Sequence, residues 1–341
     1  MDILLLQIDP ALEPSAKTSA GYSGPADATN LGTCFSDVAE SRLNHPAVAT
    51  RASSFSYSWL ARAAKQVRRY LSSRPQHAAG TRVALQLPNS PEYVAAFYGT
   101  LLADCVVVPL PVSLEERRRT QILELAQPDV LISTPADFNA PQEHSTPSTL
   151  RLAEKNDARG PLPPPRRQNS DLAMLLFTSG SMGTPKGVML SHRNLLANAD
   201  SILRELPIRA DDRTLAVLPF CHAFGNSILQ THIMRGATLL LDRGLAFPSS
   251  IVESLREMEA TSFSAVPEVY GMLLKYGRLG ERPLPALRYM TVAGGELRHD
   301  LAEEIARRIK PASFHVMYGQ SEATARLASL QPQQLLVRRG S

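Results

Sequence analysis

Residues 175–188 read LLFTSGSMGTPKGV, in which a strand-like apolar run leads into glycines, hydroxyl side chains and one lysine. Glycine lets the backbone approach anionic oxygens, hydroxyl groups donate hydrogen bonds, and lysine supplies a mobile positive charge, so the segment predicts a polyphosphate-binding loop. It is not a Walker loop, because Gly187 follows Lys186 where that motif has serine or threonine. An ordinary hairpin rich in glycine and serine is the alternative. The residues that could contact a nucleotide are Thr178, Ser179, Gly180, Ser181, Gly183, Thr184, Lys186 and Gly187.

The chain on both sides of this loop alternates between strand-like and helical patterns. Before the loop, we expect strands at 83–87, 105–108 and 130–132, with helices at 57–71, 91–102 and 114–126. From the loop onward, helical segments separate most of the expected strands, which lie at 172–177, 214–218, 238–241, 262–266, 289–292 and 313–317. This βαβ order is typical of α/β domains in which helices cover parallel-rich sheets.

Two segments of different composition mark the start of the expected domain and the division between its lobes. Residues 10–32 are rich in small and turn-forming residues, so we expect a loose lead over 1–33 and a fold that begins near Cys34. Residues 134–170 are polar and rich in proline, which is typical of a linker. The sequence thus predicts one large domain over 34–341, with βαβ lobes at about 34–133 and 171–341.

A second motif, MYGQSEAT at residues 317–324, follows the last expected strand. Tyr318 can present a flat face to an adenine ring, and Gly319 permits a turn. Ser321 can bind an α-phosphate oxygen, and Glu322 can hold a Mg²⁺ ion that links phosphates. Taken alone, the motif could also be a loop with a capping pair of serine and glutamate.

Together, TSGSMGTPKGV and YGQSE resemble the phosphate loop and the YGxTE element of the adenylate-forming superfamily. This superfamily includes acyl-CoA synthetases, adenylation domains of nonribosomal peptide synthetases, and luciferases. SHRNLLANA at 191–199 is similar to the continuation of their loop, and the resemblance extends over about residues 35–341. Met182 stands where a hydroxyl residue is usual, which removes a possible phosphate contact, whereas Ser321 replaces a threonine and keeps the hydroxyl. The resemblance implies the large N-terminal domain of the adenylate-forming fold.

The resemblance also assigns an acid-binding region. LPFCHAFG at 218–225 is similar to the family segment with an aromatic or histidine gate, which makes His222 the candidate, with a purely structural histidine as the alternative. Phe224 is a candidate for the same wall, and a core aromatic is the alternative. VAGGE at 292–296 is similar to the family's strand-to-glycine turn, where bare backbone lies beside the adenine and the substrate carboxyl. Its candidates are Gly294, Gly295 and Glu296, and an ordinary strand-to-helix turn is the alternative.

The segments expected to line the acid pocket, 226–234 and 263–270, are mostly uncharged. An apolar tunnel fits a fatty or aromatic acid, whereas the ammonium of an amino acid normally needs a buried carboxylate partner. Asp200 and Glu205, which follow the phosphate loop on an expected helix, leave the amino-acid alternative open.

By resemblance, the implied enzyme is an AMP-forming acid–thiol ligase. The carboxylate of a small-molecule acid attacks the α-phosphate of ATP to give acyl-AMP and pyrophosphate. The thiol of CoA or of a phosphopantetheine carrier protein then takes the acyl group. Lys186 would hold the β- and γ-phosphates, Ser321 the α-phosphate, Glu322 the Mg²⁺ ion, and His222 would contact the acid. Such chemistry depends on positioning and charge neutralisation more than on a protein nucleophile.

The resemblance further predicts an incomplete site. Members of the superfamily continue with a TGD-type aspartate for the ribose hydroxyls, a hinge, and a small mobile domain that carries a lysine, whereas no TGD sequence occurs here. We therefore expect a fragment, an incomplete gene product, or one part of a split enzyme that pairs with a separate C-terminal domain. A non-catalytic module that binds a nucleotide or an acyl-adenylate is the alternative function.

The composition indicates a globular chain. With 341 residues, of which 44% are hydrophobic, it can bury a large core. Its 36 basic and 32 acidic residues give a net charge of only +4, so nucleic acid is not an expected partner. The three cysteines are far apart, which favours reduced thiols and a cytoplasmic location. The sequence contains no apolar run of about twenty residues, so we expect no integral membrane segment. Attachment to a membrane surface is a separate alternative that this pattern leaves open.

Overall fold

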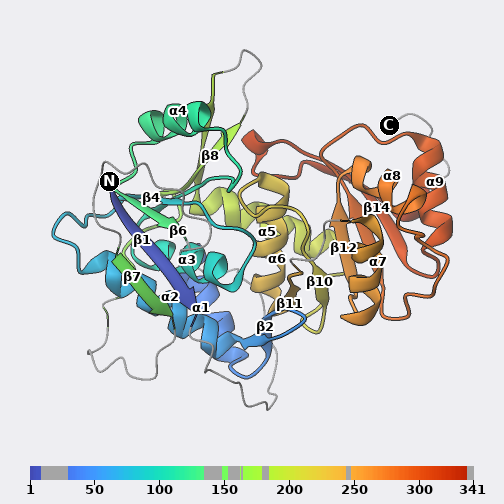
Figure 1. The fold of residues 1–341 in the computed structure, drawn as a ribbon, viewed down its shortest axis with the longest axis horizontal. Coiled ribbons are helices and arrows are strands. Elements are labelled where there is room, and N and C mark those ends of the chain that lie inside the picture. Colours follow the sequence, from blue (N-terminus) through green and yellow to red (C-terminus); the bar gives the residue numbers. More distant parts are fainter. Residues whose placement is uncertain are drawn as a thin grey trace. The chain divides into compact units, whose positions relative to one another are not determined.

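The structure of the chain, a computed structural model, describes residues 1–8, 30–133, 148–152, 162, 164–178, 184–242 and 247–335. The chain folds as two compact units (Figure 1). The first comprises Met1–Pro46 and Phe55–Ala197, and the second comprises Ala47–Ser54 and Asn198–Ser341. Two largely parallel sheets with helices between their strands confirm the expected α/β class.

The first unit contains a seven-stranded sheet in the order β7-β1-β6-β4-β5-β8-β9. Its strands are β1 (Asp2–Ile8), β4 (Arg82–Leu85), β5 (Val106–Pro109), β6 (Val130–Ser133), β7 (Ser148–Leu152), β8 (Leu172–Thr178) and β9 (Lys186–Ser191). Neighbouring strands are parallel except β8 and β9, which form an antiparallel hairpin. The helices are α1 (Leu31–Ser41), α2 (Tyr57–Ser72), α3 (Pro91–Leu102), α4 (Glu116–Ala126) and the first part of α5 (His192–Glu205).

Helix α3 is almost entirely buried, which explains its apolar sequence. It begins after Ser90, whose side chain accepts a hydrogen bond from the Tyr93 N–H. Gly99 lets α3 approach α2 closely, because a Cβ at this position would lie 2.6 Å from both the Ala64 carbonyl oxygen and Val67 Cβ. Helix α4 closes a further apolar cluster with β4, β5, β6 and β8. The predicted helices at 57–71, 91–102 and 114–126 are thus confirmed as α2, α3 and α4.

Two strands lie in segments for which the sequence predicts loose chain. β1 falls in the expected lead and pairs with β6, with Leu4 opposite Ile132, while β7 falls in the expected linker and pairs with β1. The apolar run DILLLQI is typical of a strand in a parallel sheet. The boundary between the units falls within α5 rather than in the linker, because β8 pairs with β5 in the first sheet. Residues 9–29 and most of 134–170 lie outside the described residues.

The second sheet has eight strands in the order β15-β14-β13-β12-β10-β11-β2-β3. They are β2 (Pro46–Ala49), β3 (Ser54–Ser56), β10 (Arg213–Leu215), β11 (Thr238–Leu240), β12 (Ser262–Ala265), β13 (Tyr289–Val292), β14 (Ser313–Tyr318) and β15 (Ala328–Leu330). β14 and β15 are antiparallel, whereas the strands from β2 to β14 along the sheet are parallel. The helices are α6 (Ala223–Arg235), α7 (Pro248–Glu257), α8 (Pro267–Lys275) and α9 (His299–Arg308), with the short 3₁₀ helices η1 (Ser321–Ala323) and η2 (Pro332–Gln334). The six strands expected from 172–177 onward correspond to β8 and β10–β14.

Residues 47–54 join the second sheet although they precede most of it by more than a hundred positions in the sequence. β2 pairs in parallel with β11. Arg51 then donates hydrogen bonds to the Asp242 carboxylate at 2.6 Å and to Ser254 Oγ at 2.8 Å, and it also pairs with Glu257. Because the Asp242 side chain is only 6% exposed, these contacts tie 47–54 firmly to the second unit.

Strands β12, β13 and β14 give the second sheet two different faces. They read SFSA, YMTV and SFHVMY, so polar and apolar residues alternate along most of their length. Phe263, Met290 and Phe314 occupy matching positions on one face and pack in a buried apolar cluster with residues of α7, α8 and α9. The opposite face, here termed the hydroxyl face, carries Ser262, Ser264, Tyr289, Thr291, Ser313 and His315.

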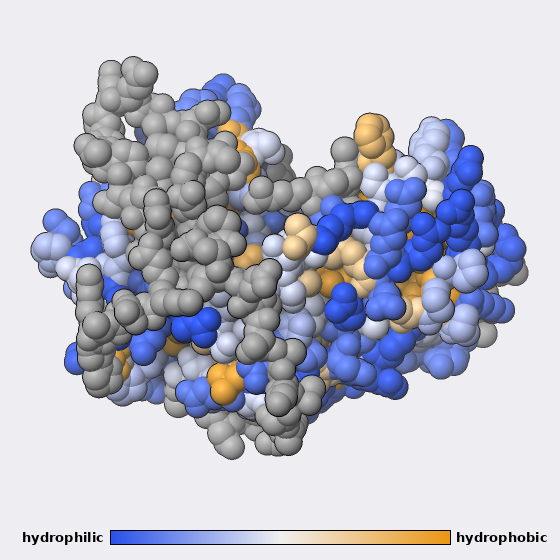
Figure 2. Space-filling view, turned by 60° about the horizontal axis from the view of Figure 1, so that its bottom comes forward, coloured by the Kyte–Doolittle hydropathy of each residue, from blue (hydrophilic) through white to orange (hydrophobic). Residues whose placement is uncertain are grey.

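Most of the described surface is hydrophilic in the view of Figure 2, and hydrophobic residues form smaller patches on it. Among the described helices, none combines the length and the hydrophobicity needed to cross a membrane.

Candidate functional site

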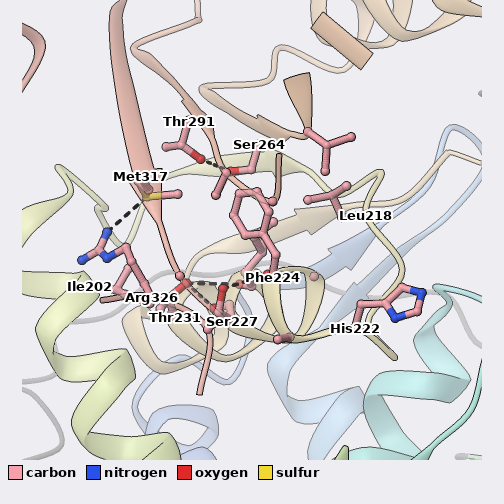
Figure 3. Close-up of a pocket in the computed structure, with 18 of the residues that line it drawn as sticks. Ile202, Leu218, His222, Phe224, Ser227, Thr231, Ser264, Thr291, Met317 and Arg326 are labelled. Atoms are coloured by element: carbon pink, nitrogen blue, oxygen red, sulfur yellow. Dashed lines mark hydrogen bonds between the residues drawn. The ribbon is translucent and has the colours of Figure 1, made fainter. Parts of the chain in front are cut away.

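A pocket of about 320 Å³ lies in the second unit, between α6 and the hydroxyl face of the sheet (Figure 3). Its lining comes from the end of α5, from α6 and the segment before it, and from β12, β13, β14 and the loops that follow them. In α/β folds, ligands usually bind beyond the carboxyl ends of parallel strands. Apolar side chains form most of the walls, among them Ile202, Leu218, Phe224, Ile228 and Val266.

The loop after β14 carries the second sequence motif, and its Gly319 and Ser321 line the pocket. A Cβ at Gly319 would overlap the carbonyl oxygen of Ala325, so glycine is needed because the loop folds back on itself. The Leu327 N–H then donates to the Tyr318 carbonyl oxygen at 2.9 Å. Gly319 is therefore explained by closure of the loop, without any ligand.

Surrounding residues hold this loop in an unusual conformation. Thr324 and Ala325 have φ angles of 73° and 150°, which persist only when neighbouring structure fixes them. The Asn198 side-chain amide, on α5, donates to the Arg326 carbonyl oxygen at 2.8 Å. The Arg326 side chain is 6% exposed and pairs with Glu205, also on α5, at 2.9 Å. Helix α5 thus holds the end of the loop at Arg326, through the backbone carbonyl of this residue and through its side chain.

The polar residues of the motif remain accessible. Tyr318 is 64% exposed, Glu322 is exposed and Ser321 is half-buried. Among the described residues, none forms a hydrogen bond or an ion pair with the Glu322 carboxylate. This fits a Mg²⁺ ion held by one carboxylate together with phosphate oxygens and water, as is usual for Mg²⁺. The described residues include no group of three or more His, Cys, Asp or Glu side chains that could hold a metal on its own.

The VAGGE turn connects β13 to α9. Gly294 lines the pocket and has a φ of +88°, a conformation that favours glycine. Gly295 and Glu296 are exposed, and neither is among the residues that line the pocket. The structure therefore brings Gly294 to the pocket and leaves Gly295 and Glu296 outside its lining.

Helix α6 begins after His222, whose backbone is extended. His222 lines the pocket, but in Figure 3 its imidazole points away from Ser264 and Thr291, whereas Phe224 points toward the middle. Desolvation lowers the pKa of His222 below its usual value, so the imidazole is neutral near pH 7.

The phosphate-loop candidates lie on the β8–β9 hairpin of the first unit. Thr178 ends β8 and pairs with Lys186 at the start of β9, so the two ends of the loop are adjacent. Lys186 is exposed, and no described residue forms an ion pair with it. Gly187 lies opposite Phe177, and a Cβ there would be 3.2 Å from the ring, so a side chain at this position would require the ring to shift by a few tenths of an ångström. Thr184 is exposed, and the candidates that lie outside the described residues are Ser179, Gly180, Ser181 and Gly183, together with Met182.

The pocket also has polar residues that the sequence interpretation missed. Ser264, Thr291, Tyr289 and His232 all line it and are each at most 5% exposed. Ser264 and Thr291 occupy opposite positions on β12 and β13, and the Thr291 hydroxyl donates to Ser264 Oγ at 2.8 Å. The sequences SFSA and YMTV alternate between polar and apolar residues, and this alternation could have predicted that one face of these strands is polar. The expected apolar tunnel is therefore apolar on most walls and polar along the hydroxyl face.

His232 and Tyr289 form a second buried pair. His232 Nδ1 lies 2.9 Å from the Ile228 carbonyl oxygen, so this nitrogen carries the proton and Nε2 is an acceptor. The Tyr289 hydroxyl lies 3.4 Å from Nε2 and can donate to it. Burial lowers the pKa of His232, which keeps the ring neutral.

The two carboxylates that left the amino-acid alternative open are both paired. Asp200 forms an ion pair with Arg204 at 2.5 Å, and Glu205 pairs with Arg326 at 2.9 Å. Neither lines the pocket. The described lining thus offers no carboxylate for a substrate ammonium.

The candidates therefore form two groups. His222, Gly294, Gly319 and Ser321 line one pocket of the second unit, and Tyr318 and Glu322 lie on its loop. Thr178, Lys186 and Gly187 lie together on a hairpin of the first unit.

Comparisons with known proteins agree with this architecture. The family described as AMP-binding enzyme matches residues 35–341. Feruloyl-CoA synthase from Amycolatopsis sp is 31% identical over 248 residues, which cover 72% of this chain and 50% of that protein. 2-Succinylbenzoate–CoA ligase from Bacillus licheniformis is 27% identical over 267 residues, which cover 77% of this chain and 54% of that protein. The inhibitor-bound N-terminal domain of FACL13 from Mycobacterium tuberculosis has the same fold, with a TM-score of 0.81 at 23% identity over 92% of this chain and 81% of that chain.

The chain belongs to the AMP-binding enzyme family, as the resemblance of its two motifs predicts. It spans about half the length of curated relatives such as feruloyl-CoA synthase.

Proposed function

We propose that this chain serves the ATP-dependent activation of a carboxylic acid as part of an acid–thiol ligase. The acid and ATP give an acyl-AMP and pyrophosphate, and the acyl group then passes to the thiol of CoA or of a carrier protein's phosphopantetheine. The observation that carries the proposal is the loop after β14, which presents Ser321 to a mostly apolar pocket and leaves Glu322 unpaired among the described residues. Family membership supports the same class of reaction.

The proposed roles follow from the chemistry of each residue. The Ser321 hydroxyl donates to an α-phosphate oxygen, and Tyr318 stacks on the adenine. Glu322 holds Mg²⁺, which when bound neutralises negative charge on the phosphates. Lys186 and the Thr178 hydroxyl bind the outer phosphates. These interactions position the acid and the α-phosphate for attack, which is the main requirement of phosphoryl chemistry.

The proposed acid is fatty or aromatic. Its hydrocarbon part lies along the apolar walls, with Phe224 in the middle and the neutral His222 at the side (Figure 3). A free amino acid fits less well, because Asp200 and Glu205 are already paired with arginines. The name of one relative, feruloyl-CoA synthase, also favours an aromatic acid.

We further propose that the protein works in the cytoplasm, where thiols stay reduced. Cys34, Cys105 and Cys221 are buried free thiols. Burial raises the pKa of Cys105 and of Cys221 to about 12, so both stay protonated and unreactive near neutral pH.

Titration calorimetry of the 341-residue chain with ATP and Mg²⁺ tests the nucleotide site. Glu322→Gln and Lys186→Ala should each weaken binding about tenfold to hundredfold, because losing a charged hydrogen-bond partner costs about 1.5–3 kcal/mol. Glu124→Gln on α4 and Lys65→Ala on α2 change exposed residues outside the site and should bind like the parent. If Glu322→Gln and Lys186→Ala also bound like the parent, the nucleotide assignment would be wrong.

An acyl-adenylate mimic in which a sulfamate replaces the phosphate tests the acid side. It should bind more tightly than adenosine sulfamate without the acyl group, because it also fills the pocket. Equal affinities would contradict the acid pocket. Acid-dependent exchange of pyrophosphate into ATP tests the chemical step, and tight mimic binding without exchange would favour the alternative of a non-catalytic module.

A further inference from the structure

Ser264 and Thr291 form a buried hydroxyl pair on the wall of the pocket. They face each other on β12 and β13, and their exposed fractions are 5% and 1%. A pair of hydroxyls has two O–H donors, and the bond from Thr291 to Ser264 uses only one. Among the described residues, no acceptor receives the Ser264 O–H. The pair therefore keeps one buried donor beside the pocket, and such a donor is unfavourable until a partner binds it.

The other hydroxyls on this part of the lining are already used as donors. Figure 3 shows Ser227 and Thr231 across the pocket from the Ser264–Thr291 pair. Ser227 donates to the Phe224 carbonyl oxygen and Thr231 to the Ser227 carbonyl oxygen, each at 2.7 Å. The Tyr289 hydroxyl can donate to His232 Nε2, 3.4 Å away. Apart from Ser321, which is assigned to phosphate, the pair is thus the hydroxyl donor that the described lining leaves for a ligand.

The charges around the pocket favour an uncharged partner for this donor. Arg326 is the only permanently charged residue of the described lining, and it is paired with Glu205 at 2.9 Å. Its Nη1 also lies 3.3 Å from Met317 Sδ. A second carboxylate or an ammonium on the acid would therefore be buried without a partner, whereas a hydroxyl, ether or carbonyl oxygen would not need one.

The size of the pocket favours a compact acid. Its volume is about 320 Å³. This lies near the lower end of the roughly 300–1,000 Å³ that is typical of small-molecule pockets. A substituted benzoate or cinnamate suits a pocket of this size.

We infer that the Ser264–Thr291 pair donates a hydrogen bond to a neutral oxygen on a compact acid of the size of a substituted benzoate or cinnamate, and that oxygen-substituted acids are preferred over hydrocarbon acids of equal size. The inference rests on the proposed function and names the substrate class of the same pocket. A site built to hydrogen-bond a substrate oxygen discriminates strongly against an analogue that lacks it, because its own polar group is then left unpaired.

Matched pairs of acids test this preference. Benzoates and cinnamates with a hydroxyl at the 2, 3 or 4 position of the ring are compared with the same acids carrying a methyl group there. Binding is measured by calorimetry in the presence of ATP and Mg²⁺. In the best pair, the hydroxy acid should bind the parent protein about tenfold more tightly than its methyl counterpart.

The decisive variant changes both residues, because removing one hydroxyl frees the other to donate. In Ser264→Ala/Thr291→Val, the ratio of the two affinities should fall to near one. Thr214→Val is the matched control, since Thr214 is a fully buried hydroxyl on β10 of the same sheet, without a hydrogen-bond partner among the described residues and outside the pocket lining. It should keep the ratio of the parent. Each ratio compares two ligands on one protein, so a general loss of stability cancels.

The outcomes separate this inference from the proposed function. No preference for the hydroxy acid in any pair, or a preference that survives in the double variant, would overturn the inference while acid binding still supports the proposed function. If no acid of either kind binds in the presence of ATP and Mg²⁺, the proposed function fails and the inference fails with it.

Discussion

Replacing Asn198 with aspartate should weaken binding of ATP and Mg²⁺ more than replacing it with alanine. The Asn198 amide donates to the Arg326 carbonyl oxygen at 2.8 Å and lies 3.5 Å from the Ala323 carbonyl oxygen. Asn198→Ala removes a neutral hydrogen bond, which contributes about 0.5–1.5 kcal/mol to holding the loop of Ser321 and Glu322. Asn198→Asp has nearly the same shape but turns a carboxylate oxygen toward carbonyl oxygens, which adds a further cost of about 1–3 kcal/mol.

Calorimetry should therefore show binding weakened about twofold to tenfold for alanine and about tenfold to a thousandfold for aspartate. Hydrogen exchange at the Leu327 amide reports on the loop without nucleotide, because this N–H donates to the Tyr318 carbonyl oxygen. Exchange should quicken from the parent to alanine to aspartate. Asn194→Asp is the control: Asn194 accepts hydrogen bonds from Ser191 through Oδ1, and aspartate keeps that acceptor. Parent-like binding and exchange in Asn198→Asp would refute the role of Asn198 in holding the loop.

Two further predictions concern stability. Gly99→Ala should lower the free energy of unfolding by about 1–3 kcal/mol through overpacking, whereas Gly271→Ala on α8, where a new Cβ meets no atom within 4 Å, should raise it by up to about 1 kcal/mol. Denaturant unfolding checks both, and a shared sign would contradict the packing argument. Acid should also destabilise the chain, because burial lowers the pKa of His192 and of His315 from 6.5 to about 4. Between these two pH values the unfolded chain binds protons at the two histidines, whereas the folded chain does not. The free energy of unfolding is therefore highest above about pH 6.5 and decreases as the pH falls toward 4. At pH 4.5 the decrease is about 2–3 kcal/mol for each histidine. Unfolding at pH 7 and pH 4.5 should show a smaller loss in His315→Gln, and an unchanged loss would exclude His315 as a cause.

The elements that the sequence predicts are those whose pattern lies within their own segment. Helix α3 has its start signal at Ser90 and a continuous apolar run behind it, so its bounds of 91–102 could be predicted. β9 could not be predicted in this way, because Lys186 and Gly187 are typical of a loop and belong to a strand only through their pairing with β8. β1 and β7 depend in the same way on partners distant in the sequence.

The candidate site shows a similar limit. The motif at 317–324 identifies Ser321, which the structure places on the pocket. Glycine is needed at position 319 because the loop folds back and brings the Ala325 carbonyl oxygen against it. No local sequence pattern predicts this contact. The hydroxyl face could be predicted from strand alternation, but its place on the pocket wall depends on the register of β12 with β13 and on the packing of α6.

Because residues 47–54 complete the second sheet, the two units cannot be separated by a single cut in the chain. A fragment that begins at Asn198 would lack β2, so β11 would become an edge strand with unpaired backbone groups, which invites aggregation. It would also lack Arg51, the ion-pair partner of the nearly buried Asp242. Order of synthesis has a related consequence. The ribosome releases residues 47–54 before β11, so β2 must wait until β11 has been synthesised before the two strands can pair.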